Sequence, residues 1–124
     1  MTVTCLRVHD LVSGEVDPGG AHVVLVDRLW PRGITKEALK IETWAKEVAP
    51  STELRQMVHG DPSRWDEFER RYVAELDANP DAWQPLLDAA RAGTVTLLYS
   101  AKNTERNNAT VLKAYLERRL AESE

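Results

Sequence analysis

The chain contains little cysteine and no long apolar run. Cys5 stands alone among 124 residues, so no internal disulfide can form and a reducing compartment is expected. The first ten residues include Arg7 and Asp10 and lack the apolar core of a secretory signal. No segment approaches the roughly 20 apolar residues that a membrane-spanning helix needs. These absences predict a cytoplasmic protein that does not enter the membrane.

Several motifs that would identify a reaction are missing. The three histidines, His9, His22 and His59, do not show metal-ligand spacing, so no metal site is expected. Gly19 and Gly20 lack the Lys-Ser/Thr pair that completes a phosphate-binding loop, and neither GxGxxG nor GxSxG occurs. The residues alone therefore indicate no reaction class, substrate or cofactor.

Composition and charge are those of an acidic globular domain. Hydrophobic residues make up 43% of the chain and charged residues 29%. A chain of this length and composition can form a hydrophobic core without disulfide or metal cross-links. The net charge of -4 gives no global attraction to nucleic acid or to an anionic membrane, although a local basic patch can still exist. One domain over residues 1–124 is expected, and the oligomeric state does not follow from composition.

Three segments are predicted to be strands. They cover residues 4–8, 22–29 and 94–100, and the second contains an unbroken apolar run typical of a strand covered on both faces. More than sixty mostly helical residues separate the last two, which allows a parallel pair with helices packed on the sheet. We predict a small α/β domain, three-layer-like, with a few-stranded, mostly parallel sheet and a C-terminal helix. The loop over 9–21 leaves the direction of the first strand open.

Helical segments are expected to fill the middle and the end of the chain. The expected elements are a turn over 36–40 capped by Thr35, an amphipathic piece over 41–48, a helix over 52–58 capped by Ser51, a helix opened by Asp61, a helix over 81–92 ended by Gly93, and a last helix capped by Thr104. The helix after Asp61 carries one apolar stripe, predicted to be core rather than a stacking surface: Trp65, Phe68, Tyr72 and Leu76.

Polar sequence follows both buried strands, and a site is expected there. Parallel strands place their ligand sites beyond their carboxyl ends, so residues 27–36 and 99–108 should converge. Arginine forks match phosphate or carboxylate, and a helix N-terminus favours anions. We predict that this edge binds a small phosphate- or carboxylate-bearing ligand. The side chains expected to contact it are Arg28, Trp30, Arg32, Lys36, Ser100, Lys102, Asn107 and Asn108.

A second group of candidates lies near residue 55. The group consists of Ser51, Arg55, His59 and Asp61, and Arg55 and His59 are four residues apart, so that one helical face could present both. Histidine can act as an acid or base, but one placed before a Gly-Asp-Pro turn is more often a local partner. Asp27 and Tyr99 are the other weak candidates for moving a proton.

A structural explanation of the same residues remains open. Arg28 can pair with one of the 20 carboxylates, and Trp30 can simply cover the top of the core. In that case the asparagines hold a loop instead of facing a ligand. Cys5 lies in a strand and is expected to be a buried, unreactive thiol.

Four stretches of the chain together resemble the YeaO-like family, a domain of unknown function in small bacterial and archaeal proteins. They are VLVDRLWPRGITK (24–36), WAKEVAPSTELR (44–55), DPSRWDEFERRYVAEL (61–76) and VTLLYSAKNTERNNATVL (95–112). The resemblance implies no established activity, and its motif residues coincide with the predicted pocket. Those residues are Asp27, Arg28, Trp30, Pro31, Arg32, Gly33, Lys36, Pro50, Ser51, Arg55, Tyr99, Lys102, Asn107 and Asn108.

Three functions compete on this sequence. The first is the binding of a small anion, with or without catalysis. The second is a nucleic-acid-associated module that uses the same basic edge, which ranks lower because few cations cluster there. The third is a non-catalytic protein-interaction module, for which exposed tryptophans among Trp30, Trp44 and Trp83 would be the sign.

Overall fold

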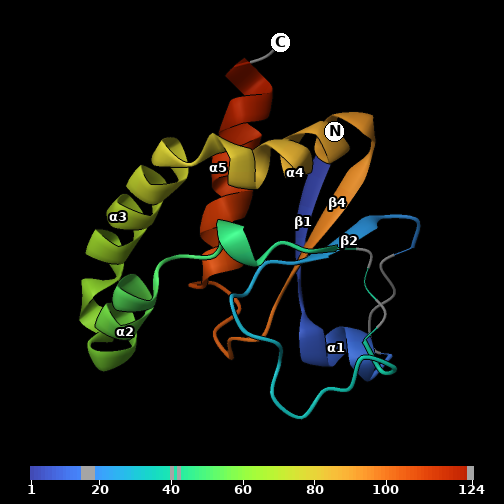
Figure 1. The fold of residues 1–124 in the computed structure, drawn as a ribbon, viewed down its shortest axis with the longest axis horizontal. Helices are drawn as coiled ribbons and strands as arrows, with labels where there is room; N and C mark the ends of the chain where they lie inside the picture. Colours follow the sequence, from blue (N-terminus) through green and yellow to red (C-terminus); the bar gives the residue numbers. More distant parts are fainter. Residues whose placement is uncertain (15–18, 40, 42, 123–124) are drawn as a thin grey trace.

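A four-stranded, wholly parallel sheet forms the centre of the computed structural model, which describes residues 1–14, 19–39, 41 and 43–122 (Figure 1). The strands are β1 (Thr2–Arg7), β2 (His22–Leu25), β3 (Thr43–Trp44) and β4 (Thr94–Tyr99). The helices are α1 (Val8–Val12), α2 (Thr52–Gly60), α3 (Trp65–Ala78), α4 (Pro80–Ala92) and α5 (Asn108–Glu122), with short 3-10 turns η1 (Lys46–Val48) and η2 (Pro62–Arg64). The predicted small α/β domain is confirmed.

The strand order β1-β4-β2-β3 settles the direction of the first strand. Neither of the first two strands pairs with the other, because β4 lies between them and is parallel to both. Val3 stands opposite Val95, and Val24 opposite Leu97. All carboxyl ends therefore lie at one edge, in the lower half of Figure 1.

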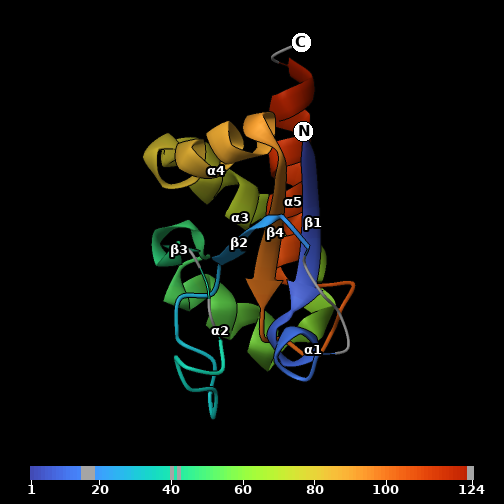
Figure 2. The ribbon, with the colours of Figure 1, turned by 90° about the vertical axis from the view of Figure 1, so that its right-hand side faces the viewer.

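Side chains alternate between two cores, one on each face of the sheet. Val24, Val95 and Leu97 pack with buried residues of α3, α4 and α5. Val23, Leu25 and Leu98 point to the opposite face, where they meet α1 and the segment after β2. Figure 2 shows β1 and β4 side by side with α5 running along them. The continuous apolar run of β2 reflects this double burial.

Local capping chemistry begins the middle helices where the sequence predicts. The Ser51 hydroxyl accepts a hydrogen bond from the Leu54 N–H, and Asp61 accepts one from the Ser63 N–H. The predicted stripe of α3 packs in the core, with Phe68 and Tyr72 buried. None of the described helices combines the length and apolarity that crossing a membrane requires.

Four local predictions are wrong. The strand expected over 22–29 ends at Leu25. The segment expected to be a loop from residue 9 begins within α1. The piece expected to be an amphipathic helix over 41–48 contains β3, because pairing with β2 outweighs its helical pattern. The last helix begins at Asn108, where Asn107 rather than Thr104 accepts from the Thr110 N–H. Residues 15–18, 40 and 42 of the predicted segments lie outside the described residues.

Candidate functional site

A cavity of about 680 Å³ opens at the carboxyl edge of the sheet. Four parts of the chain line it: residues 27–32 after β2, residues 49–50 before α2, residues 55–68 of α2, η2 and the start of α3, and residues 100–108 after β4. Its volume falls in the range of roughly 300–1,000 Å³ that small-molecule sites occupy. We call this space the basic cavity.

Asp27 ties the two strand-end segments together. Its Oδ2 accepts hydrogen bonds from the Ser100 N–H at 2.9 Å and from the Ser100 hydroxyl at 2.5 Å. Its Oδ1 accepts from the Asn108 side-chain amide at 3.2 Å, and that amide also donates to the Val26 carbonyl at 3.0 Å. The Asp27 carboxylate is therefore an anchor whose two oxygens are both engaged.

Arg28 holds backbone carbonyls, and among the described residues it forms no ion pair with a carboxylate. Its Nη2 donates to the Ala49 carbonyl at 3.1 Å and to the Pro50 carbonyl at 3.3 Å, and its Nε donates to the Pro50 carbonyl at 3.4 Å. The guanidinium thus fixes the segment before α2, and Arg28 also lines the wall of the basic cavity.

The remaining cations of the basic cavity have no partner among the residues that the structure describes. Among the residues that the structure describes, no hydrogen bond or ion pair involves the side chain of Arg32, Arg55, Lys102 or Arg106. With Arg28, five cations face one carboxylate, Asp27. The cavity is strongly positive in a chain whose net charge is -4.

The wall formed by α2, η2 and α3 carries apolar and aromatic side chains beside Arg55 and His59. Val58, Pro62, Trp65 and Phe68 line it. The ring of Trp65 is half-buried and stacks on Phe68, with centroids 4.9 Å apart and planes 25° apart. The predicted stripe is therefore not purely core, because its first two members also line the cavity.

The two asparagines hold the entry to α5. The Asn107 side chain accepts from the Thr110 N–H at 3.0 Å and donates to the Asn103 carbonyl at 2.9 Å. Asn108 is bonded to Asp27 as described above. Because both residues line the basic cavity, the partial positive charge of the α5 N-terminus lies at its wall.

Most of the predicted site residues come together in the basic cavity. Those that line it are Asp27, Arg28, Trp30, Arg32, Arg55, His59, Ser100, Lys102, Asn107 and Asn108. The sequence reasoning did not propose Arg106, Trp65 or Phe68 for the site. The position of Arg106 in the segment after β4 could have indicated its place in the site. The spacing of Trp65 and Phe68 is that of ordinary core residues and gave no such indication.

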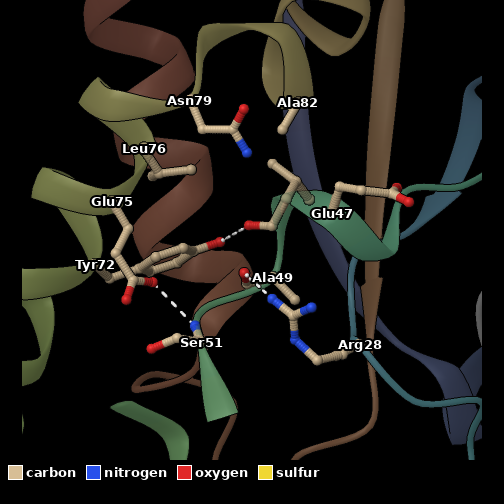
Figure 3. Close-up of a pocket in the computed structure, with 10 residues that line it drawn as sticks. Arg28, Glu47, Ala49, Ser51, Tyr72, Glu75, Leu76, Asn79 and Ala82 are labelled. Atoms are coloured by element: carbon tan, nitrogen blue, oxygen red, sulfur yellow. Dashed lines mark hydrogen bonds between the residues drawn. The ribbon is translucent and has the colours of Figure 1, made fainter. Parts of the chain in front are cut away.

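Three predicted residues lie elsewhere. Lys36 is exposed in a turn and does not line the cavity. Tyr99 is 3% exposed, packs in the core, and burial raises its pKa. Ser51 lines a separate, smaller pocket of about 200 Å³ together with Arg28 and Glu75 (Figure 3).

In the smaller pocket, several polar groups form hydrogen bonds with one another, drawn as dashed lines in Figure 3. The Tyr72 hydroxyl donates to the Val48 carbonyl at 2.6 Å, and the Ser51 N–H donates to Glu75 Oε1 at 2.9 Å. Burial raises the pKa of Tyr72 far above its usual value. Within the described part of the chain, no group of three or more His, Cys, Asp or Glu side chains is placed to hold a metal ion.

The fold and the cavity define a small α/β protein with a basic ligand-sized site. The family model DUF488-N3i, described as the inactive DUF488-N3 subclade, matches residues 2–124, and the chain belongs to this family.

Curated relatives agree with the predicted resemblance. Uncharacterized protein YeaO of Escherichia coli (strain K12) is 43% identical over 116 residues, which cover 94% of this chain and 97% of that protein. Uncharacterized protein Rv3073c of Mycobacterium tuberculosis (strain H37Rv) is 39% identical over 108 residues, covering 87% and 91% respectively. No solved structure matches the chain.

Proposed function

We propose that the protein binds a small phosphate- or carboxylate-bearing ligand in the basic cavity, and that binding rather than chemical conversion is its role. The observation that carries this proposal is the group of four cations, Arg32, Arg55, Lys102 and Arg106, without partners among the described residues. Like charges gathered at one concave wall repel one another, and an anion relieves that repulsion. Arginine adds bidentate geometry for phosphate or carboxylate.

The candidate proton-transfer groups support binding rather than catalysis. Both oxygens of Asp27 accept hydrogen bonds from Ser100 and Asn108, and Tyr99 does not line the cavity. His59 is the remaining candidate in the wall, and no described carboxylate is hydrogen-bonded to orient it. The description of the family as inactive agrees with a binding role.

A thermal-shift screen tests the proposal. Inorganic phosphate, pyrophosphate, phosphorylated metabolites and di- and tricarboxylates are added at near-neutral pH to wild type, Arg32→Ala and Lys102→Ala. A ligand at about 100 times its Kd stabilises by roughly 2.7 kcal/mol, which raises Tm by several degrees in a domain of this size. We expect such a shift in wild type and its loss in both variants.

Arg70→Ala provides the matched control, because Arg70 is an exposed arginine of α3 that does not line the cavity. It should keep the full ligand shift. If no anion shifts wild type, or if Arg70→Ala loses as much as Arg32→Ala, the proposal is wrong.

The nucleic-acid alternative is tested in the same experiment with a short single-stranded oligonucleotide. Binding that falls steeply with salt would favour that function. The tryptophan signal for a protein interface is weak, since Trp83 is buried and donates to the Leu76 carbonyl, and Trp30 packs edge-on against Trp44.

A further inference from the structure

The basic cavity has an aromatic wall and a cationic wall that come from different elements, except that one cation, Arg55, belongs to α2 beside the aromatic wall. Trp65, Phe68 and Pro62 belong to the side formed by α3 and the turn before it. Arg32 belongs to the segment after β2, and Lys102 and Arg106 to the segment after β4. A ligand that carries only negative charge would use the cationic wall and leave the aromatic wall bare.

From this division we infer that the ligand carries a planar aromatic ring together with its phosphate. The inference rests on the proposed function, because the phosphate is the group that the cations hold. The ring lies against Trp65, and the phosphate faces Arg32, Lys102 and Arg106. A cavity of about 680 Å³ has room for both parts.

Trp65 is suited to stack a ring. Its indole is half-buried, and the buried ring of Phe68 supports it at 4.9 Å in a nearly parallel arrangement. A ring held in this way keeps its orientation without a ligand, so little side-chain freedom is lost when a second ring stacks on it. Stacking on an aromatic side chain depends little on which ring binds, because every planar ring has a π-face.

The same chemistry has two small-molecule sources, a nucleotide and a simple aryl phosphate. Both carry a planar ring and a phosphate, and they differ in the sugar between the two groups. The two sources are separate arms of the test.

Calorimetric titration of wild type with four ligands tests the inference. The ligands are adenosine 5′-monophosphate, phenyl phosphate, ribose 5-phosphate and inorganic phosphate. Stacking contributes enough to tighten binding about tenfold or more. We expect at least one ring-bearing phosphate to bind about tenfold more tightly than ribose 5-phosphate and inorganic phosphate. Tighter binding by the nucleotide than by phenyl phosphate identifies the nucleotide as the source, and the reverse identifies the aryl phosphate.

Two substitutions at one position assign the effect to the ring. Trp65→Phe keeps an aromatic face and should keep the preference, whereas Trp65→Leu keeps apolar volume and should lose it while still binding inorganic phosphate. If Trp65→Leu does not fold, the four-ligand series in wild type still decides. Equal affinities for all four ligands would overturn the inference and leave the anion site standing. No binding by any of them would overturn the inference, and the thermal-shift screen with carboxylates would then decide the proposed function.

Discussion

Two cavities lie on either side of the segment from Val48 to Ser51, and both include Arg28 and Ala49 in their walls. In the smaller pocket, the Tyr72 hydroxyl and the Ser51 N–H each have a protein partner. In the basic cavity, four cationic side chains have none among the described residues. Polar groups with partners hold the fold together, and unpaired charges gathered in a concave wall remain available to a ligand.

This difference predicts that substitutions of the hydrogen-bonded residues lower the free energy of unfolding, whereas substitutions of the unpaired cations weaken ligand binding. Asp27→Ala should have the largest effect on stability, because it removes the acceptor for Ser100 and Asn108 and leaves their donors unpaired. Hydrogen bonds to a charged group contribute roughly 1.5–3 kcal/mol each. The three bonds share one part-buried carboxylate and are not additive, so a total loss of about 3 kcal/mol is expected. Urea unfolding measures it.

The control for this prediction is Glu69→Ala, which removes an exposed carboxylate of α3. Its free energy of unfolding should change by less than about 0.5 kcal/mol. If Asp27→Ala is no more harmful than Glu69→Ala, the strand-end segments hold together without their shared carboxylate.

Tyr72→Phe should have a smaller effect, restricted to the small pocket. It removes one buried hydrogen bond and leaves the Val48 carbonyl without that donor. A loss of about 1–2 kcal/mol in the free energy of unfolding is expected. Ligand affinity in the basic cavity should be unchanged in the folded variant, and a large change there would show that the two cavities are coupled.

Arg28 and Arg32 give the sharpest contrast within one segment. Arg28→Ala should lower stability by about 1–2 kcal/mol, because the carbonyls of Ala49 and Pro50 lose their donor. Arg32→Ala should change stability by less than about 0.5 kcal/mol and weaken anion binding. Chemical unfolding and ligand titration of both variants decide it, and similar stability losses in the two would contradict the distinction.

Cys5 lines neither cavity, so ligand binding should have the smallest effect on its thiol. Its thiol donates to the Ala109 carbonyl at 3.3 Å, and burial raises its pKa from 9.0 to about 11. The protonated thiol is favoured in the fold, so its contribution to stability is complete below pH 9 and is lost as the pH rises to 11.

Thiol labelling checks this prediction. At pH 8 the folded protein should react slowly, and its rate should rise about tenfold per pH unit toward pH 10 as thiolate forms. Added phosphate should not change the rate. Fast labelling at pH 8 would mean that Cys5 is exposed more often than the fold implies.

Much of the fold follows from local sequence signals. The unbroken run of β2, the cap at Ser51 and the stop at Gly93 all correspond to structure, because each depends on neighbours in the chain. The edge strand β3 was missed because only its pairing with β2 makes it a strand. The start of the last helix was misplaced because Thr104 and Asn107 are both good caps, and tertiary contacts choose between them.

The site was harder to predict from the sequence than the fold. Parallel strands alone predict that the segments after β2 and β4 meet, and Arg55 and His59 were placed on one face by their spacing. Trp65 was taken as core because helical periodicity does not distinguish a buried ring from a ring at a cavity wall. Tyr99 was a poor candidate because its side chain packs in the core and does not line the basic cavity.

The strand order has a consequence for synthesis. β4 is the last strand to leave the ribosome, yet β1 and β2 pair with it and not with each other. Val3 lies opposite Val95, so β1 has no pairing strand until β4 has been synthesised. Pairing across such a sequence separation slows folding, and a nascent chain that stalls before Thr94 leaves β1 without a partner and one edge of β2 open to aggregation. The sheet can therefore be completed only after β4 has been synthesised.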